Sequence, residues 1–237
     1  EVIPCHGAGD GMFAILSVLL NPGDEVITFD PTYTLSSAVP TFLGASVHTV
    51  PLADGGDWIP DLDLIESRVE QVLSPRTRIF ILVNPDNPTG HVFHRDLLTR
   101  LGKKLRQHGV LVLEDQVYEK VVYPPNEFIS MISIPGMREN TICVSSFAKS
   151  YLCAGMKAGY IVGPPELVQA LRHYYMLNSF TPNTVALRAG ADILSGPQGF
   201  LDDWIKQWDE FRQKTVQALN SIPGVSCHLP EAGTYCL

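Results

Sequence analysis

The sequence has 237 residues, of which 45% are hydrophobic and 18% are charged. This length and balance suit one large globular domain, or one and a half, with enough apolar side chains to bury a core. The net charge of -8 argues against a nucleic-acid-binding surface and against binding to anionic membranes. No apolar run approaches the length of a membrane span.

The first half of the chain alternates between helical and strand-like patterns. Residues 11–20 are apolar enough for a buried helix, and residues 24–30 indicate a short buried strand after the turn Asn21-Pro22-Gly23. The pattern then predicts a helix at 33–43, a strand at 45–52, a helix at 61–73 with Leu62, Ile65, Val69 and Val72 at helical spacing, and a continuous apolar strand at 78–84.

The second half continues the alternation. It predicts a helix at 95–107, strands at 110–115, 141–146 and 158–163, and helices at 165–176, 182–194 and 199–221. Strands without polar alternation, separated by helices, predict an α/β fold with a mostly parallel sheet and helices on both faces.

The last stretch, GVSCHLPEAGTYCL, has the pattern of two strand beginnings after a long helix. We therefore expect a large domain over residues 1–221 and the truncated beginning of a small domain over 222–237. The sequence also lacks an initiator Met and begins inside a structured segment, so we expect a fragment of a longer chain.

The cysteines and histidines favour reduced thiols over a metal site. The five cysteines are odd in number and form no CxxC pair, which is typical of a cytoplasmic protein. His91 and His94 are close in sequence, but without a third ligand nearby metal binding is the less favoured interpretation. We expect a cytoplasmic location and no metal.

Polar groups follow several of the predicted strands, at the strand ends where ligands collect in such sheets. An opening strand is followed by His6-Gly7-Ala8-Gly9-Asp10-Gly11, and the strand at 78–84 runs into NPDNPTG. Asp115 ends the next strand with Tyr118 three residues on, and Ser146 ends another with Lys149 three residues on. The sequence predicts that these groups share one rim.

Each of these signals also has a purely structural interpretation. The glycine-rich turn lacks the dinucleotide fingerprint, because Met12 replaces its last glycine, but free N–H groups at a helix start suit a phosphate. NPDNPTG is turn chemistry, Asp115 could be a helix cap, and Tyr118 could belong to the core. A binding site is favoured because all of these signals occur together, each at the end of a predicted strand.

Taken together, the motifs resemble the class I/II aminotransferases, pyridoxal-phosphate enzymes of fold type I. The resemblance covers essentially the whole chain through GAGDG, NPGDEV, the P-x-Y of Pro31 to Tyr33, NPDNPTG, EDQVY, SSFAKS and GMKAGYIVGPPELV. The stretch AKSYLCAG followed by GY is most similar to the alanine and aspartate aminotransferase branches. The resemblance implies that residues 1–221 form the cofactor-binding domain.

The resemblance implies specific roles around the cofactor ring. Lys149 forms the Schiff base with pyridoxal 5'-phosphate, and its apolar surroundings favour the neutral, nucleophilic amine. Asp115 faces the pyridine nitrogen and keeps it protonated, which makes the ring a better electron sink. Tyr118 and Asn87 hydrogen-bond the phenolic oxygen, and Tyr33 stacks on the ring face.

It also implies a phosphate cup made by the Ala8 and Gly9 amides, the Ser146 hydroxyl and Lys157. Here the chain departs from the family pattern, which has arginine at position 157 and often a hydroxyl residue at position 9. Lysine keeps the charge but loses the two-pronged geometry. Gln116 replaces a frequent acid beside Asp115.

The implied substrates are an amino acid and a 2-oxo acid, and the implied assembly is a homodimer. The family's arginine for the substrate α-carboxylate falls beyond Leu237, and its N-terminal gating segment precedes Glu1. We therefore expect this chain to hold the cofactor domain without the full substrate site.

Three alternatives stay open at this point. The same cofactor serves β-lyases, decarboxylases, oxidases and cyclases. In these enzymes the substrate-binding residues decide which reaction the substrate carbanion undergoes. Ser146 to Lys149 is also an S-x-x-K string, but the S-D-N and K-T-G elements of serine acyl-enzymes do not occur in the sequence. A non-catalytic homologue is disfavoured because Lys149, Asp115 and Tyr118 are all present.

Overall fold

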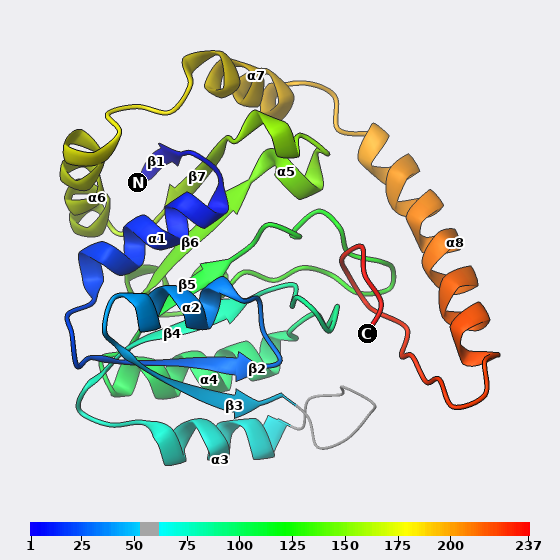
Figure 1. Ribbon diagram of the computed structural model, residues 1–237, viewed down its shortest axis with the longest axis horizontal. Helices are drawn as coiled ribbons and strands as arrows, with labels where there is room; N and C mark the ends of the chain where they lie inside the picture. Colours follow the sequence, from blue (N-terminus) through cyan, green and yellow to red (C-terminus); the bar gives the residue numbers. More distant parts are fainter. Residues whose placement is uncertain (53–61) are drawn as a thin grey trace.

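The computed structural model describes residues 1–52 and 62–237. Its centre is a seven-stranded sheet with the order β1-β7-β6-β5-β4-β2-β3 (Figure 1). The strands are β1 (Val2–Cys5), β2 (Glu25–Asp30), β3 (Ser46–Pro51), β4 (Thr77–Val83), β5 (Leu111–Asp115), β6 (Thr141–Ser146) and β7 (Gly159–Val162). β7 is antiparallel to β1 and β6, and the pairs from β6 to β3 are parallel, which confirms the mostly parallel sheet.

The helices lie close to their predicted positions. They are α1 (Ala8–Leu19), α2 (Leu35–Phe42), α3 (Leu62–Val72), α4 (Arg95–Gln107), α5 (Phe147–Ser150), α6 (Pro165–Asn178), α7 (Thr184–Ser195) and α8 (Phe200–Asn220). The single turn α5 was not predicted, because four residues are too few for a periodic pattern. Of the helix predicted at 61–73, residue 61 and the side chain of Leu62 lie outside the described residues.

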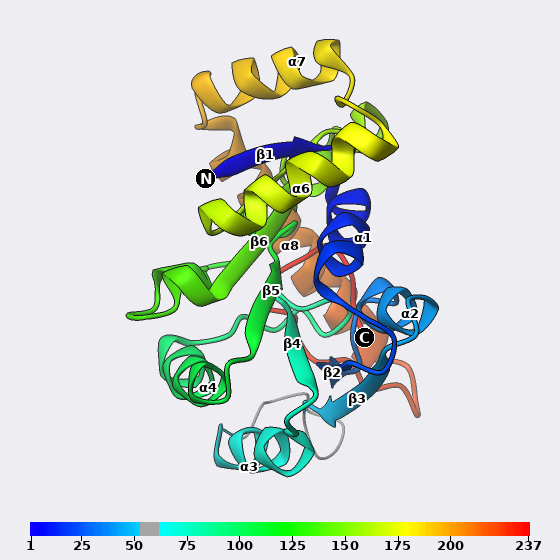
Figure 2. The same cartoon turned by 90° about the vertical axis from the view of Figure 1, so that its left-hand side faces the viewer.

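Helices cover both faces of the sheet, as the apolar strands predicted. Along β4, Ile79 and Ile81 pack in one core cluster with α1 and α6, whereas Phe80 and Leu82 pack in a second cluster with α3 and α4. Seen from the side, α1 and α2 lie on one side of the strands and α3 and α4 on the other (Figure 2). This alternation fixes which strand residues face each layer.

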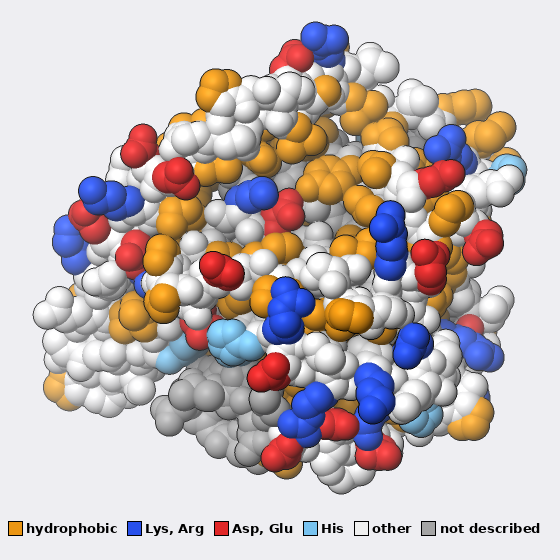
Figure 3. All heavy atoms as spheres, turned by 180° about the vertical axis from the view of Figure 1, so that it is seen from behind, with side chains coloured by type: hydrophobic (Ala, Val, Ile, Leu, Met, Phe, Trp, Pro, Cys, Tyr) orange, Lys and Arg blue, Asp and Glu red, His pale blue; other side chains and the backbone are white. Residues whose placement is uncertain are grey.

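The outer surface of α3 and α4 carries charges of both signs. Arg100 pairs with Asp63 and Glu66, and Lys104 pairs with Glu70. Figure 3 shows blue and red atoms intermingled over the lower part of this side of the molecule, with orange atoms in a broad band above them. None of the helices in residues 1–52 and 62–237 is long and apolar enough to cross a membrane.

Residues 228–235, which we call the C-terminal strap, return from α8 to the sheet. The two strand beginnings predicted after α8 are wrong: apart from an isolated bridge between Val122 and Ala232, residues 222–237 contain no strand. The strap instead lies along the loop after β4 and the turn after β5, with Ala232 fully buried. That residues 222–237 open a second domain stays a prediction.

Candidate functional site

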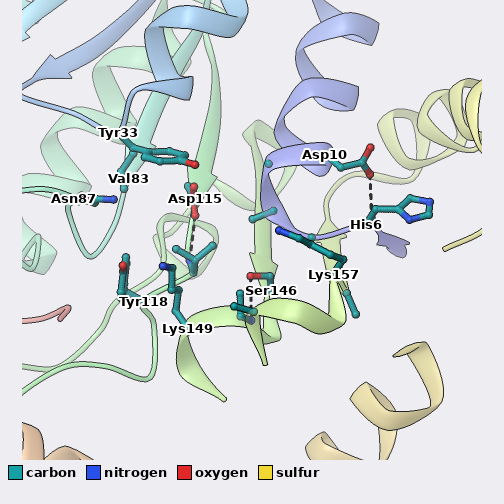
Figure 4. A pocket seen from close by; sticks show the side chains of 17 residues that line it. His6, Asp10, Tyr33, Val83, Asn87, Asp115, Tyr118, Ser146, Lys149 and Lys157 are labelled. Atoms are coloured by element: carbon teal, nitrogen blue, oxygen red, sulfur yellow. Dashed lines mark hydrogen bonds between the residues drawn. The ribbon is translucent and has the colours of Figure 1, made fainter. Parts of the chain in front are cut away.

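A cavity of about 370 Å³ opens at the rim where β1, β4, β5 and β6 end (Figure 4). These four strands run in the same direction, so their carboxyl ends meet at one edge. All nine residues predicted to surround a cofactor line this cavity: Ala8, Gly9, Tyr33, Asn87, Asp115, Tyr118, Ser146, Lys149 and Lys157. The fold therefore brings together side chains that are widely spread in the sequence.

The start of α1 forms one wall. Gly7 precedes the helix with a φ of 90°, a left-handed conformation that favours glycine, and no side chain in the described part of the chain caps the helix start. Asp10 turns away from the cavity, since its carboxylate accepts hydrogen bonds from the His6 amide at 3.0 Å and the Tyr175 hydroxyl at 2.8 Å. The Ala8 and Gly9 amides are left for an anion.

Ser146 and Lys149 come from the junction between β6 and α5. The Ser146 hydroxyl oxygen accepts a hydrogen bond from the Ala148 amide at 3.4 Å, which leaves its proton free to donate into the cavity. Below, the Ser150 hydroxyl donates to the Val117 carbonyl at 3.1 Å and fixes this turn against the end of β5. The junction between β6 and α5 thus places the Ser146 hydroxyl and the Lys149 amine in the same cavity.

Lys149 is the central cation of this cavity. Its Nζ lies 5.8 Å from the centre of the Tyr118 ring, and both side chains point into the cavity (Figure 4). Among residues 1–52 and 62–237 no carboxylate forms an ion pair with it. An amine that no carboxylate pairs with can reach a group bound in the cavity and react with it in its neutral form.

Asp115 faces the cavity from the end of β5, and its side chain is almost fully buried. One oxygen accepts a hydrogen bond from the Val117 amide at 3.1 Å. Burial, with a smaller contribution from the negative charge of Glu114, raises the pKa of Asp115 to about 6. A buried carboxylate with these neighbours would gain from a cationic partner in the cavity.

Asn87, Tyr118 and Tyr33 complete the walls. Asn87 belongs to the loop after β4, which is closed by hydrogen bonds from the Asp86 amide to the His91 carbonyl and from the Gly90 amide to the Asp86 carbonyl. Tyr118 is 3% exposed, whereas Tyr33 is 36% exposed at the mouth of the cavity. A flat group bound in the cavity could contact Asn87 and Tyr118 along its edge, while Tyr33 would cover its face.

Lys157 reaches the cavity because β7 is antiparallel. It lies just before β7, so it returns to the rim where β6 ends, and its side chain extends toward the start of α1 (Figure 4). Its φ is 50°, a left-handed conformation that is uncommon for residues other than glycine. The amine therefore lies on the side of the cavity formed by the Ala8 and Gly9 amides.

Gln116 lies outside the cavity lining and belongs to a buried network behind it. Its amide nitrogen donates to Glu114 Oε2 at 2.7 Å, and Asn84 donates to Glu114 Oε1 at 3.0 Å. The Met131 amide also donates to the Glu114 carboxylate. Burial raises the pKa of Glu114. The departure from the family pattern at Gln116 thus falls behind the site.

Sequence reasoning missed the apolar part of the lining. Val83, Val117, Ala148, Ala154 and Ala158 close the cavity between the polar groups. Each lies within three residues of a strand end or of Lys157, so proximity to the predicted polar residues was the available signal. His6 and Asp10 also border the cavity, but their side chains point away from it.

Comparison with known proteins gives a consistent result. The family model for aminotransferase class I and II matches residues 1–237. An aspartate aminotransferase from Rhizobium meliloti (strain 1021) is 31% identical over 243 residues, an alignment that covers 99% of this chain and 57% of the relative. An aspartate aminotransferase from Musicola paradisiaca is 28% identical over 235 residues, and the alignment covers 99% of this chain and 58% of that relative.

Solved structures match over nearly the whole chain. N-succinyldiaminopimelate aminotransferase from Mycobacterium tuberculosis superposes with a TM-score of 0.89 at 29% identity, covering 98% of this chain and 60% of that one. Aspartate aminotransferase from Rhizobium meliloti superposes with a TM-score of 0.90 at 28% identity, and the match covers 98% of this chain and 58% of that one. The chain thus spans a little under three fifths of the length of these relatives.

Proposed function

The chain belongs to the class I and II aminotransferase family, and from this premise we propose that the protein moves an amino group between an amino acid and a 2-oxo acid with pyridoxal 5'-phosphate as cofactor. One observation carries the proposal: Lys149, Asp115 and the uncapped start of α1 border the same cavity. An amine, a carboxylate and an anion site are the three groups that this cofactor requires.

The residues present fit the cofactor. The phosphate would rest on the Ala8 and Gly9 amides, the Ser146 hydroxyl and the Lys157 amine, which all line one side of the cavity. The raised pKa of Asp115 is what a carboxylate shows when burial is not offset by a cation, and a protonated pyridine nitrogen would supply that cation. Asn87 and Tyr118 would donate to the phenolic oxygen, and Tyr33 would cover the ring.

Bound pyridoxal phosphate supplies an electron sink for a carbanion at the substrate Cα. The residues of this chain would do the rest. Lys149 would hold the cofactor covalently through its amine, and the freed Nζ would then move the proton at the substrate Cα. Asp115 would hold a proton on the ring nitrogen, and the apolar lining around Val83 and Ala158 would limit the entry of water.

The names of the relatives support aminotransfer over other fates of the same carbanion, since they are aspartate and N-succinyldiaminopimelate aminotransferases. We assign an amino acid donor and a 2-oxo acid acceptor as classes and leave the individual substrates open. The free thiols of all five cysteines support the proposed cytoplasmic location.

We also propose a homodimer. Exposed apolar side chains run from the end of α6 across the connection to the start of α7: Leu177 is 90%, Phe180 76% and Val185 77% exposed. Side chains of this size at this exposure favour an interface, and a second copy of the chain is the partner that the family favours.

An absorption experiment on the full-length protein tests the reaction class. A near-visible band that bleaches with one amino acid and returns with a 2-oxo acid is the expected result. A band that bleaches with release of ammonia or CO₂, without recovery by any 2-oxo acid, would assign a lyase or decarboxylase instead.

A further inference from the structure

The C-terminal strap ties together the two cavity walls that carry Asn87 and Tyr118. On the loop after β4, the Gly90 carbonyl accepts hydrogen bonds from the Glu231 amide at 2.9 Å and the Ala232 amide at 2.8 Å. On the turn after β5, the Tyr123 amide donates to the Glu231 carbonyl and the Gly233 amide donates to the Val121 carbonyl, both at 2.9 Å. The strap therefore pairs with both walls.

Side chains reinforce the backbone pairing. Glu231 accepts from the Val92 amide at 2.9 Å and lies 2.8 Å from His91 Nδ1. The Tyr123 hydroxyl donates to the Gly233 carbonyl at 2.6 Å, and Tyr123 is only 2% exposed. These contacts fix the strap behind the two walls of the cavity.

Tyr235 touches both walls with one side chain. Its hydroxyl donates to the Asp86 carbonyl at 2.6 Å, one residue before Asn87. Its ring packs edge-to-face on Tyr118, with centroids 5.2 Å apart and an interplanar angle of 89°. Tyr235 does not line the cavity itself, so its influence on a bound group must pass through Asn87 and Tyr118.

We propose that Tyr235 is a positioning residue, which sets the relative placement of Tyr118 and Asn87 and so tunes their hydrogen bonds to the cofactor. The proposal rests on the proposed function, because it needs a cofactor oxygen that both residues contact. Its physical basis is that a hydrogen bond tolerates little displacement, whereas a phenol ring held only at its base can pivot.

The test uses the full-length protein with Tyr235→Phe, Tyr235→Leu, Tyr118→Phe and the double variants. The readouts are the cofactor dissociation constant, the pH midpoint of the cofactor's visible band, and the melting temperature. A donor to the phenolic oxygen stabilises its anionic form, so losing that donor raises the pH midpoint. Tyr174→Phe on α6 is the matched control, since its hydroxyl accepts a hydrogen bond from Asn178 on the same helix and Tyr174 does not line the cavity.

We expect Tyr235→Phe to weaken cofactor binding roughly twofold to tenfold, as the loss of one hydrogen bond would. Tyr235→Leu should do so more strongly and shift the pH midpoint in the same direction as Tyr118→Phe. In the Tyr118→Phe background, Tyr235→Leu should shift the midpoint less than it does in the wild-type background, because only the Asn87 hydrogen bond is left for it to disturb. Tyr174→Phe should match wild type in binding and midpoint.

Additive shifts of the midpoint, or a lower melting temperature with unchanged binding and midpoint, would overturn the positioning role. If Tyr235→Leu does not fold, Tyr235→Phe alone and with Tyr118→Phe gives the same comparison. A Tyr118→Phe protein that behaves as wild type would instead refute the proposed role of Tyr118, and the inference about Tyr235 would fall with it.

Discussion

Asp115 combines deep burial with a negative neighbour, and this combination has a measurable consequence before any cofactor binds. Burial raises its folded-state pKa from 3.8 to about 6, so the folded protein without cofactor binds this proton more tightly than the unfolded chain does. The free energy of unfolding therefore falls as the pH rises from about 4 through 6. The carboxylate destabilises the cofactor-free protein at neutral pH.

We predict that Asp115→Asn raises the free energy of unfolding of the cofactor-free protein at pH 7 by on the order of 2 kcal/mol. The asparagine oxygen retains the Val117 amide as a donor, so the change removes mainly the charge. Denaturant unfolding at pH 7 and pH 4 measures this, and the difference should shrink toward zero at pH 4. The same variant should lose most of its turnover. Equal stability at pH 7 together with near wild-type turnover would contradict both roles.

Lys157 is one of the residues at which the sequence departs from the expected family pattern, and the structure brings it to the cavity. We predict that Lys157→Arg tightens cofactor binding by about 1 kcal/mol if one charge-assisted hydrogen bond is gained. Lys157→Ala should weaken binding by more, because the phosphate loses this cation. Dissociation constants of the three proteins decide the point, and three equal values would place Lys157 outside the phosphate site.

At this scale the sequence predicted which polar side chains gather around one cavity, whereas Val83, Val117, Ala148, Ala154 and Ala158 were not predicted. The roles of these residues toward a cofactor stay predictions. Asp115 and Ser146 could be placed because parallel strands deliver their ends to one rim. Lys157 lies at this rim only because β7 runs antiparallel to β6. The apolar pattern of a strand does not reveal the direction in which the strand runs. The hydrogen bonds that turn Asp10 away from the cavity reach Tyr175, 165 residues along the chain.

The strap has no regular secondary structure apart from one isolated bridge, yet it packs closely against the loop after β4. Gly90 has a φ of 71°, and a Cβ added there would lie 2.5 Å from Pro230 Cβ and 2.8 Å from the Ala232 carbonyl. An alanine would suffer both backbone strain and a clash with atoms of the strap.

We therefore predict that Gly90→Ala lowers the free energy of unfolding by roughly 2–4 kcal/mol. Gly155→Ala is the matched control, because a Cβ there meets no atom within 4 Å. Denaturant unfolding of both variants is the measurement. If Gly90→Ala were as stable as Gly155→Ala, the strap would be able to move away from the added Cβ without lowering the free energy of unfolding.

Regular elements could be predicted because helix and strand periods are written in local sequence. The predicted helix at 95–107 matches α4 to the residue. The strap could not be predicted in this way, since it has no period and its partners are remote. The Glu231 bond to Val92 spans 139 residues and the Tyr235 bond to Asp86 spans 149.

For the whole molecule, the exposed apolar residues at the end of α6, in the connection and at the start of α7 predict association. Leu177→Arg should convert the proposed dimer to a monomer, because a charge at the centre of an apolar interface is costly to bury. Phe42→Arg on α2 is the control, at another strongly exposed apolar position that is 77% exposed. Sedimentation velocity of both variants measures the outcome. A dimer that survives Leu177→Arg would place the interface elsewhere.

The central claim is that this cavity holds pyridoxal phosphate covalently on Lys149, and borohydride reduction with peptide mapping tests it most directly. Reduction of the full-length protein loaded with cofactor should leave one pyridoxyl group on the peptide containing Lys149, and Lys149→Ala should carry none while still binding cofactor without a covalent bond. A pyridoxyl group on another lysine, with Lys149 unmodified, would contradict the account.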